Sequence, residues 1–536
     1  MTKSLTDAAP VAPSISGVRN LGELIARAAA RWGERIAWRF PHCDQSLSFT
    51  EVDQLTRTLA ARLAAAGIGA GDAVALMAKN TPAYPAVWLA LARLGAATVP
   101  LNTSYRMTDA SHTIEHADAR WIICQDEYRP LMEQVANRVG AVTVLSAEEL
   151  LRTSRADAAA PNVGGTAVDR AGPDTVCNIQ YTSGTTGRPK GCVLGHDYWL
   201  AIAWTLVNEF PDLDDHDVML TAQPFHYIDP QWNVVAALLS GAELVILDRF
   251  HPSSFWDEVR RHGVTYFYCL GVMPTLLLRM PSSAIDRSSR VRVIQCSAIP
   301  PDLHHALEER WGVPWFEAYG TTETGSDLYI GYEDHDATVG TGTTGRPRRH
   351  RRVDVVTSEG RTVKRGEVGE LLISGYGIMR GYHHDEDATA RTLRSGWYRT
   401  GDLATLDDEG RVVFRGRTKD MIRRSGENIA AAEVEEVLLR HPGIRLAAVL
   451  PVADELRGEE VLAVMVANEG SGTETELLAK VAAYCRSELA YFKVPRYWRF
   501  VDELPLTASE RVRKAELARS TTGCWEQQVD EWHRHD

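Results

Sequence analysis

Short apolar runs alternate with helix-patterned stretches through most of this chain, and that alternation restricts the possible folds more than any other feature. An apolar strand pattern at residues 73–77, a helical pattern at 83–94 that Gly95 ends, and a second strand pattern at 97–100 predict one βαβ unit. Further strands are expected at 121–124, 243–247, 264–269 and 291–296. The chain up to about residue 330 is therefore predicted to form a layered α/β fold with largely buried sheets.

The pattern changes twice beyond that point. Between about residues 340 and 415, short β-like runs broken by glycine predict a smaller β subdomain, and after residue 420 a new helix-and-strand pattern predicts a separate domain. The chain of 536 residues is long enough for several hydrophobic cores. We predict a disordered lead at 1–17, an N-terminal domain at 18–416, a hinge at 417–420 and a small α+β C-terminal domain at 421–536.

Composition argues against several classes of protein. A formal net charge of -13 disfavours a general nucleic-acid or membrane-surface binder, because both need a positive field. The eight cysteines form no C-x-x-C pair, which argues against a disulfide framework or a thiolate zinc site and favours a reducing, cytoplasmic location. No apolar run approaches the ~18 residues of a membrane-spanning helix. A phosphate ligand would therefore need local positive charge.

One stretch, Tyr181-Thr182-Ser183-Gly184-Thr185-Thr186-Gly187-Arg188-Pro189-Lys190-Gly191, suits phosphate binding. Its glycines allow backbone N–H groups to approach an anion, its hydroxyl groups can donate to phosphate oxygens, and Arg188 or Lys190 can neutralise a polyphosphate. The glycine spacing differs from the Walker A pattern, which argues against an ordinary P-loop. A flexible Gly/Thr hairpin without a ligand is the alternative interpretation of this stretch taken alone.

Five clusters further along the chain add chemistry to this loop. Tyr319-Gly320-Thr321-Thr322-Glu323 combines an aromatic face, hydroxyl groups and a carboxylate, which suit a purine, a phosphate and Mg²⁺. Tyr398-Arg399-Thr400-Gly401-Asp402 offers a carboxylate that could accept hydrogen bonds from both hydroxyls of a ribose. The other three clusters are Gly416-Arg417-Thr418-Lys419-Asp420, Ser425-Gly426-Glu427-Asn428-Ile429 and the segment from Pro505 to Lys514.

With these motifs in this order, the sequence resembles the adenylate-forming superfamily of acyl-CoA and aryl-CoA synthetases, firefly-type luciferases and peptide-synthetase adenylation domains. The resemblance extends from about residue 20 to 517. It implies a large N-terminal domain and a small, mobile C-terminal domain, with ATP, Mg²⁺ and CoA as cofactors or co-substrates. It also implies two steps: a carboxylate oxygen attacks the α-phosphate of ATP, giving an acyl-adenylate and pyrophosphate, and a thiol then displaces AMP.

The resemblance assigns roles to individual positions. The residues that resemble the loop holding the ATP phosphates are Thr182, Ser183, Gly184, Thr185, Thr186, Gly187 and Lys190. Those that resemble the adenine, phosphate and Mg²⁺ contacts are Tyr319, Gly320, Thr321, Thr322 and, for the metal, Glu323. The ribose contacts correspond to Asp402 and Arg417, the hinge residue to Lys419, and the passage for the pantetheine arm to Gly426. The expected catalytic residues are Thr186, Lys190, Glu323 and Arg511.

The C-terminal motif departs from the family pattern. The family has Pro-x-Thr-x-x-Gly-Lys, whose lysine bridges the substrate carboxylate and the α-phosphate, whereas this chain has Glu510 and Arg511 at the last two positions. A guanidinium keeps its charge and can grip an oxyanion in bidentate fashion, but it is larger and flatter than an ammonium. We expect Arg511 to take the bridging role. Lys514 is a second candidate, although a solvated surface lysine is the favoured interpretation of that residue.

A second departure lies at Gln295-Cys296-Ser297-Ala298-Ile299-Pro300, where acyl-CoA synthetases commonly have a glycine-rich element that floors the acyl pocket and approaches AMP. Ala298 is expected beside the nucleotide. The side chains of Cys296 and Ser297 are expected to narrow the pocket, which argues against a long fatty acid. Cys296 has no activating partner in the sequence, so we expect its thiol to pack rather than to react.

The substrate-side motif, Pro224-Phe225-His226-Tyr227-Ile228-Asp229-Pro230, has a histidine where amino-acid adenylation domains usually have an aspartate for the α-ammonium. An α-amino acid is therefore disfavoured. His226, Tyr227 and Trp232 are expected to form an aromatic, partly polar wall that suits a small aryl or functionalised acid. Core packing is a serious alternative for Trp232.

Arg348-Arg349-His350-Arg351-Arg352 is the densest basic run of the chain. Its charges could meet the phosphates of CoA. A solvated loop is the favoured interpretation, since proteins that resemble this chain bind CoA without a fixed motif here.

We predict an ATP- and Mg²⁺-dependent ligase that makes the CoA thioester of a small or aromatic carboxylic acid. Three alternatives stay open: adenylation of nitrite to diazotise an aromatic amine in secondary metabolism, acyl transfer to a carrier protein, and a non-catalytic nucleotide-binding relative. The altered motif and pocket floor keep the nitrite alternative open, because a tiny anion needs no acyl tunnel. The intact phosphate, ribose and metal positions argue against a loss of activity.

Overall fold

The computed structural model describes residues 10–15, 17–158, 171–182, 189–270, 273–424, 427–454, 457–506, 512–528 and 531–534. The chain falls into two compact units, Met1–Val353 with Leu372–Arg399, and Asp354–Leu371 with Thr400–Asp536. It passes from one unit to the other within three strands, β16 (Arg351–Val356), β17 (Gly369–Gly375) and β19 (Trp397–Leu406). The predicted domain division between residues 416 and 417 stays a prediction.

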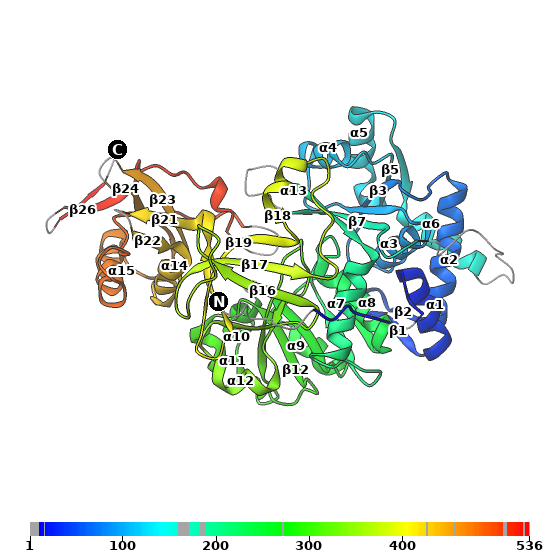
Figure 1. Cartoon of the computed structure of the whole chain (residues 1–536), viewed down its shortest axis with the longest axis horizontal. Helices are drawn as coiled ribbons and strands as arrows, with labels where there is room; N and C mark the ends of the chain where they lie inside the picture. Colours follow the sequence, from blue (N-terminus) through cyan, green and yellow to red (C-terminus); the bar gives the residue numbers. More distant parts are fainter. Residues whose placement is uncertain are drawn as a thin grey trace. The chain divides into compact units, whose positions relative to one another are not determined.

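The first unit contains a six-stranded sheet in the order β6-β5-β3-β4-β7-β8 (Figure 1). Its strands are β3 (Ala73–Met77), β4 (Ala97–Pro100), β5 (Trp121–Cys124), β6 (Thr143–Ser146), β7 (Val176–Thr182) and β8 (Lys190–Gly195). Neighbouring strands are parallel except β7 and β8. Helix α3 (Ala83–Leu94) makes the crossover from β3 to β4, so the predicted βαβ unit is confirmed with its predicted bounds.

A second sheet of the same unit has its strands in the order β15-β14-β13-β12-β11-β9-β10-β1-β2. They are β1 (Ile36–Phe40), β2 (Gln45–Ser48), β9 (Val218–Thr221), β10 (Glu243–Ile246), β11 (Tyr266–Leu270), β12 (Val293–Ser297), β13 (Trp315–Tyr319), β14 (Leu328–Tyr329) and β15 (Thr343–Pro347). In this order, every neighbouring pair of strands from β13 through β12, β11, β9 and β10 to β1 is parallel. Because parallel strands end at one edge, β12 and β13 deliver Ala298 and the Tyr319–Glu323 motif to the same edge.

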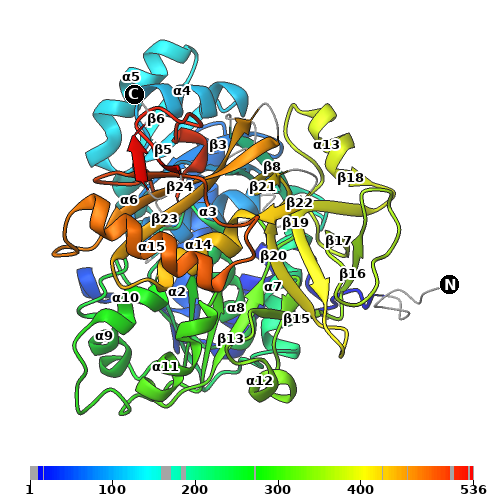
Figure 2. The same ribbon diagram turned by 90° about the vertical axis from the view of Figure 1, so that its left-hand side faces the viewer.

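Helices lie between the two sheets and over both outer faces, as Figures 1 and 2 show. The central layer includes α1 (Leu21–Trp32), α2 (Phe49–Ala65), α3, α7 (His196–Asn208) and α8 (Ile228–Ser240). The outer helices include α4 (Met107–His116) and α5 (Arg129–Val139) on the first sheet, and α9 (Phe255–Arg261), α10 (Met273–Arg279) and α11 (Pro301–Trp311) on the second. Over the described residues, none of the helices has the length and apolar character needed to cross a bilayer.

Strand periodicity explains this layering. In β3, Val74 and Leu76 belong to the central core, whereas the alternating Ala75 and Met77 face the core beneath α4 and α5. Successive side chains of a strand point to opposite faces, so a strand with apolar residues at every position is covered on both sides. The continuous apolar runs of the sequence therefore predict this arrangement.

The basic run at 348–352 corrects one expectation. Arg348, His350 and Arg351 are buried, so the predicted solvated loop is wrong for these residues. The Arg351 guanidinium pairs with the buried Asp327 at 2.6 Å and also donates to two backbone carbonyls. A guanidinium can be buried when its N–H groups find acceptors, and residue type alone does not reveal those acceptors.

Part of the N-terminal lead is described. Residues 10–15 lie within the stretch for which disorder is predicted, and the Val11 N–H donates to the Arg349 carbonyl at 2.8 Å. Residues 1–9 and 16 lie outside the described residues.

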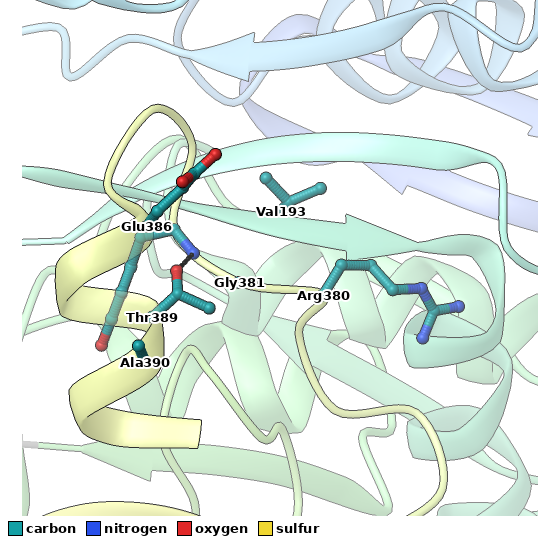
Figure 3. A pocket seen from close by; sticks show the side chains of 7 residues that line it. Val193, Arg380, Gly381, Glu386, Thr389 and Ala390 are labelled. Atoms are coloured by element: carbon teal, nitrogen blue, oxygen red, sulfur yellow. Dashed lines mark hydrogen bonds between the residues drawn. The ribbon is translucent and has the colours of Figure 1, made fainter. Parts of the chain in front are cut away.

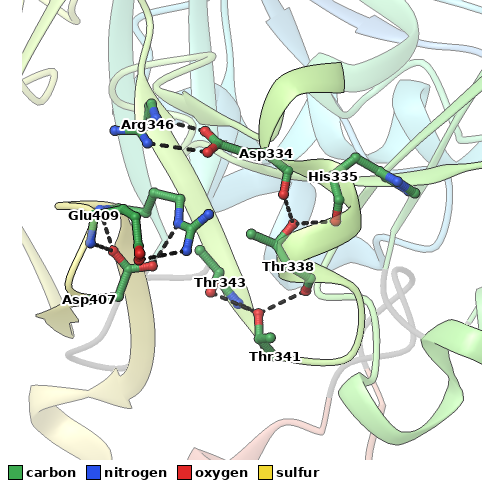
Figure 4. A network of polar contacts seen from close by, with 9 residues as sticks. Asp334, His335, Thr338, Thr341, Thr343, Arg346, Asp407 and Glu409 are labelled. Atoms are coloured by element: carbon green, nitrogen blue, oxygen red, sulfur yellow. Dashed lines mark hydrogen bonds and ion pairs between the residues drawn. The ribbon is translucent and has the colours of Figure 1, made fainter.

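A polar network holds helix α12 (Tyr332–Thr338) against strand β15, just beyond the Tyr319–Glu323 motif (Figure 4). Arg346 donates to both oxygens of Asp334, at 2.6 and 3.2 Å. The Thr338 hydroxyl donates to the Asp334 carbonyl at 3.0 Å, and the Thr341 hydroxyl donates to the Thr338 carbonyl at 2.7 Å. These bonds fix the chain that follows the motif.

The second unit is an α+β structure. Its main sheet contains β21 (Met421–Arg424), β22 (Glu427–Ala430), β23 (Ile444–Asp454), β24 (Gly458–Ala467), β25 (Tyr497–Phe500), β26 (Trp525–Gln528) and β27 (Glu531–Arg534). Helices α14 (Ala431–Arg440) and α15 (Glu474–Glu488) pack on it around a core of their own. The C-terminal strands β26 and β27 pair antiparallel, and Trp532 on β27 lies edge-on to Trp498 with ring centroids 6.3 Å apart.

Candidate active site

The Tyr319–Glu323 motif forms a tight turn at the end of β13. A Cβ on Gly320 would stand 1.8 Å from the Gly325 carbonyl oxygen, so this position requires glycine. Gly325 has a φ of +85° and donates its N–H to the Thr321 carbonyl at 2.7 Å. The hydroxyls of Thr321 and Thr324 lie 2.9 Å apart, which fixes Thr321 inside the turn.

Glu323 is held by a segment that the sequence analysis did not single out. Its Oε1 accepts a hydrogen bond from the Tyr382 hydroxyl at 2.9 Å, and its carbonyl accepts one from the Met379 N–H at 2.8 Å. The Lys190 ammonium lies over the Tyr382 ring, 5.0 Å from its centroid. Tyr382 therefore connects Lys190 and Glu323, the two predicted catalytic residues of the first unit that the structure describes.

The segment at residues 379–383 runs along β8 like an additional edge strand. The Arg380 N–H donates to the Val193 carbonyl at 2.8 Å, and the Val193 N–H donates to the Gly381 carbonyl at 3.0 Å. The His383 N–H donates to the Gly191 carbonyl at 2.8 Å. A hollow of about 340 Å³ opens beside it, and Figure 3 shows its lining residues. They are Val193, Arg380, Gly381, Tyr382, Glu386, Thr389 and Ala390.

Burial sets the protonation state of Tyr382. It raises the pKa of this phenol well above its usual value, and the Glu323 carboxylate raises it further. Burial also raises the pKa of the neighbouring Tyr398. Both phenols are therefore neutral at physiological pH, and Tyr382 can serve as a donor to Glu323.

Several predicted residues lie outside the described residues. They are Ser183, Gly184, Thr185, Thr186 and Gly187 of the phosphate loop, the pantetheine-tunnel residue Gly426, and Arg511. Their assigned roles stay predictions. Thr182 and Lys190, which flank the loop, are paired across the antiparallel strands β7 and β8, so the loop connects two adjacent strand ends. Lys419 belongs to a short 3₁₀ helix at Thr418–Asp420.

The loop after β12 has a strained residue and a buried acid that supports it. Ala298 has a φ of +67°, a left-handed conformation that costs about 1–2 kcal/mol for a residue with a Cβ. The Glu317 carboxyl accepts hydrogen bonds from the N–H groups of Ala298 and Ile299 at 2.6 and 2.8 Å. Burial raises the pKa of Glu317 to about 8, although the two N–H donors favour its charged form.

Ser297 and Cys296 lie on opposite faces of the sheet. Cys296 packs with Ile294 in the core beneath the outer helices, and burial raises the pKa of its thiol well above the ordinary value. The Ser297 hydroxyl lies 2.5 Å from the Tyr268 hydroxyl and donates to the Ala318 carbonyl at 2.7 Å. A pocket on the Ser297 face would therefore not be lined by Cys296, and the predicted narrowing by Ser297 stays a prediction.

Buried amides fix the turn that carries His226. Gln180 donates to the His226 carbonyl at 2.6 Å, and Gln231 donates to the carbonyls of Phe225 and Tyr227 at 2.9 and 3.1 Å. Neither ring nitrogen of His226 has a hydrogen-bond partner among the described residues. Burial lowers the pKa of His226 to about 3, so its imidazole is neutral and can donate or accept toward a ligand.

Trp232 and Tyr268 stand beside this turn. Trp232 is 7% exposed and belongs to the central core, as the packing alternative predicts. Its ring meets that of Tyr268 edge-on, with centroids 5.1 Å apart. Tyr268, which the sequence analysis did not single out, thus links the Trp232 side chain to the Ser297 hydroxyl.

The two predicted ribose contacts of the second unit are direct cross-strand neighbours. Asp402 on β19 lies opposite Arg417 on β20 (Val412–Arg417), and their side chains pair at 2.9 Å. The Asp402 N–H donates to the Thr400 hydroxyl at 2.9 Å, and Gly401 has a φ of +70°. The structure therefore brings these two residues together, as a common ligand requires.

Lys514 is neither solvated nor free. Its ammonium lies 2.7 Å from Glu435 and 3.9 Å from Asp420, and its side chain is 18% exposed. The favoured interpretation as a solvated lysine is wrong. Burial raises the pKa of Glu435 and the Lys514 charge opposes that rise, which indicates a structural ion pair.

Comparison with known protein families matches the AMP-binding enzyme family over residues 25–383 and the AMP-binding enzyme C-terminal domain over residues 433–511. The first match alone covers more than half of the chain. The chain belongs to the AMP-binding enzyme family. Within this family it is an adenylate-forming enzyme of the acyl-CoA synthetase-like branch.

Curated relatives of this AMP-binding enzyme are CoA ligases. The chain is 31% identical over 508 residues to a sulfoacetate–CoA ligase of Cupriavidus necator, covering 93% of this chain and 97% of the relative. It is 33% identical over 516 residues to an indoleacetate–CoA ligase of Aromatoleum aromaticum, again with 93% and 97% coverage. The enzyme is accordingly an adenylate-forming acid–CoA ligase.

A solved structure supports the same assignment. The o-succinylbenzoate CoA synthetase of Bacillus subtilis, in complex with its acyl-adenylate intermediate, matches with a TM-score of 0.82 and 25% identity over 94% of this chain and 99% of that one. The same synthetase has been solved with ATP and a magnesium ion. The mixed α/β fold class with a small α+β C-terminal domain is thereby confirmed, and the enzyme is ATP-dependent.

Glu323 of this AMP-binding enzyme has the chemistry expected of a magnesium ligand. Its carboxylate oxygens are hard donors of the type that Mg²⁺ prefers. The Tyr382 hydroxyl donates to one of these oxygens, Oε1. The residue therefore fits the predicted metal contact, which stays a prediction.

Proposed function

We propose that this enzyme activates a small or aromatic carboxylic acid with ATP and transfers the acyl group to CoA. The observation that carries the substrate class is the hydroxyl chain from Tyr268 through Ser297 to the Ala318 carbonyl. Its central residue, Ser297, lies in the segment where the family commonly has a glycine-rich element. Side-chain atoms there leave less depth for an acyl chain, which favours a short or compact acid.

The wall beside this floor suits an aryl or functionalised acid. Tyr268 offers an aromatic ring, and the core residue Trp232 packs edge-on against it. His226 offers a neutral ring whose nitrogens have no partner among the described residues. Aromatic surface with a few polar groups is typical of sites that orient a planar ligand. The relatives that act on indoleacetate, o-succinylbenzoate and sulfoacetate are consistent with such compact acids.

The chemistry we propose has two balanced steps. A carboxylate oxygen of the substrate attacks the α-phosphorus of ATP, and the bond to pyrophosphate breaks. The sulfur of CoA then attacks the carbonyl carbon, its proton is lost, and AMP leaves. Lys190 and the glycine-rich loop would neutralise the phosphates, Asp402 and Arg417 would hold the ribose, and Arg511 would bridge the two reacting anions.

Bound Mg²⁺ would lower the charge repulsion between the triphosphate and the incoming carboxylate. Glu323 would hold the ion, and Tyr382 would orient the carboxylate. Tyr382 acts here as a positioning residue, because its contact is with Glu323 rather than with a reacting atom.

Pyrophosphate and AMP release test this proposal. The purified enzyme would be given ATP, Mg²⁺ and a panel of aliphatic and aryl acids with and without CoA, and separately nitrite with an aromatic amine. Release of AMP that requires a compact acid and CoA is the expected result. Release with nitrite and no need for CoA would assign the enzyme to diazotisation. AMP formation that needs a phosphopantetheine carrier would assign it to carrier loading.

A further inference from the structure

A cluster of imidazoles lies in the first unit, and none of its members is among the predicted nucleotide, metal or substrate contacts. It consists of Asp118, which follows α4, the α4 residues His112 and His116, and the successive residues His383 and His384. The ring centroids of His383 and His384 are 3.9 Å apart, and that of His116 lies 5.9 and 6.0 Å from them. The His384 Nε2 lies 2.6 Å from an Asp118 oxygen.

The ligating atoms of Asp118, His383 and His384 all lie within 4.8 Å of one another. Around a tetrahedral Zn²⁺ with Zn–N bonds near 2.0–2.1 Å, ligand atoms stand about 3.3 Å apart. Small rotations would reach that spacing. They are feasible because Asp118 and His384 are exposed, and the 2.6 Å contact between their side chains would open.

The unpaired nitrogens of this cluster distinguish it from a structural histidine cluster. His304, Glu308 and His335 also group together, but backbone groups engage them: His304 meets the Trp315 carbonyl and the Gly340 N–H, and Glu308 accepts from the Trp315 N–H. The Nε2 atoms of His383 and His112 are buried and have no hydrogen-bond partner among the described residues. Unpaired buried imidazole nitrogens are costly unless something binds them.

We propose that Asp118, His383 and His384 form a binding site for one divalent transition-metal ion such as Zn²⁺, with water or His116 in the fourth position. Two imidazoles and one carboxylate are ligands that such ions prefer, whereas Mg²⁺ favours oxygen donors alone. The Tyr181 hydroxyl lies 2.7 Å from the His116 Nδ1 and can fix that ring from behind.

An ion at this site would tie together two distant stretches of chain. Asp118 and His384 are 266 residues apart in the sequence, and His383 directly follows Tyr382. The bound ion would therefore hold the 379–383 segment against the end of α4. Since a ligand that binds the folded chain stabilises it, the first unit should unfold at a higher temperature with the ion bound.

Co²⁺ is the probe that tests this site. Untagged, EDTA-treated enzyme would be titrated with Co²⁺ in the presence of excess Mg²⁺, and the visible absorption of tetrahedral Co²⁺ would be recorded. We expect one equivalent to bind. His384→Ala should weaken binding at least tenfold and remove the rise in Tm that Zn²⁺ causes. Circular dichroism of the metal-free variant should match the wild type, since His384 is exposed.

His216→Ala is the matched control. His216 is also an exposed histidine between acidic residues, in the group Asp214, Asp215 and His216, but it offers a single imidazole. This variant should keep the Co²⁺ spectrum and the Zn²⁺-dependent Tm. The proposal is overturned if wild-type enzyme shows no Co²⁺ band, if His384→Ala retains it, or if His216→Ala loses it.

Discussion

The Tyr382 hydroxyl donates a 2.9 Å hydrogen bond to Glu323 Oε1. The two residues are 59 positions apart, and a backbone bond from Met379 to the Glu323 carbonyl brings their segments together. Glu323 is the predicted metal contact, so the orientation of its carboxylate depends on a phenol from another part of the chain. The Lys190 ammonium lies over the ring of Tyr382, so this tyrosine contacts both Lys190 and Glu323.

Tyr382→Phe tests this arrangement. The ring and its contact to Lys190 stay, but the hydrogen bond to Glu323 is lost. A hydrogen bond to a charged group is worth about 1.5–3 kcal/mol, so kcat/KM for ATP should fall about tenfold or more. Steady-state AMP release over a range of Mg²⁺ concentrations would measure the loss, and half-saturation should need more Mg²⁺.

Tyr491→Phe is the control for that experiment, because Tyr491 is 87% exposed and its hydroxyl is available to water. Its AMP release should match the wild type. Unchanged Mg²⁺ dependence in Tyr382→Phe would show that the Tyr382 hydroxyl does not position Glu323.

Glu317 predicts a pH-dependent stability. Its pKa is raised to about 8 in the folded chain by burial, above its ordinary value near 4.5. As the pH rises from about 4.5 to 8, the unfolded chain loses this proton first, so the folded state loses stability across that window. Each pKa unit corresponds to about 1.4 kcal/mol, which makes the loss a few kcal/mol.

Comparison with Glu317→Gln isolates this effect from the other titrating groups. The amide cannot ionise, and its oxygen can accept only one of the two bonds from Ala298 and Ile299, which should cost about 1–3 kcal/mol at low pH. Urea unfolding midpoints measured from pH 5 to 8 should fall more steeply in the wild type than in the variant. Parallel pH profiles would contradict the raised pKa.

Regular elements were predictable from the sequence because their signals are local. The strands at 73–77, 97–100 and 121–124 have their predicted bounds, since each is a short, largely apolar run. The proximity of Asp402 and Arg417 was also predictable, because both occupy motif positions and their strands are joined by a short turn; their contact with a ribose stays a prediction.

Other parts of the site depend on contacts between distant residues, which periodicity cannot reveal. Tyr382, Glu317 and Gln180 act through hydrogen bonds to segments elsewhere in the chain. Charge was misleading for the same reason. A run of arginines predicts exposed side chains unless buried acceptors for their N–H groups are known. The acceptor of Arg351 is Asp327, which lies 24 residues away in the sequence.

Ser297→Gly tests the pocket floor. Removing the hydroxymethyl group breaks the link between Tyr268 and the Ala318 carbonyl and deepens any pocket on that face. One methylene in a hydrophobic pocket is worth about 1–3 kcal/mol, so the ratio of kcat/KM for a longer acid to that for a short one should rise about tenfold or more. AMP release with a series of aliphatic acids would measure the ratio.

Cys296→Ala is the matched comparison, since Cys296 points to the opposite core. It should lower stability by about 1–2 kcal/mol without changing the chain-length preference. A similar change in preference for both variants would show that the effect passes through the backbone and would count against Ser297 as the floor.

Variants of Arg511 and Lys514 distinguish the roles of these two cations, because either could replace the lysine of the family motif. Lys514 is already paired with the half-buried Glu435 at 2.7 Å. Lys514→Ala should therefore destabilise the second unit by about 1–3 kcal/mol, since it leaves a carboxyl without its partner, and should leave AMP formation per folded molecule largely intact. Arg511→Ala should instead abolish AMP formation with little change in Tm or in ATP binding, and Arg511→Lys should restore part of the activity because an ammonium keeps the charge. Single-turnover adenylation and thermal unfolding of the three variants measure both effects. If Lys514→Ala alone abolishes turnover, the bridging charge belongs to Lys514 and the Glu435 pair must open during catalysis.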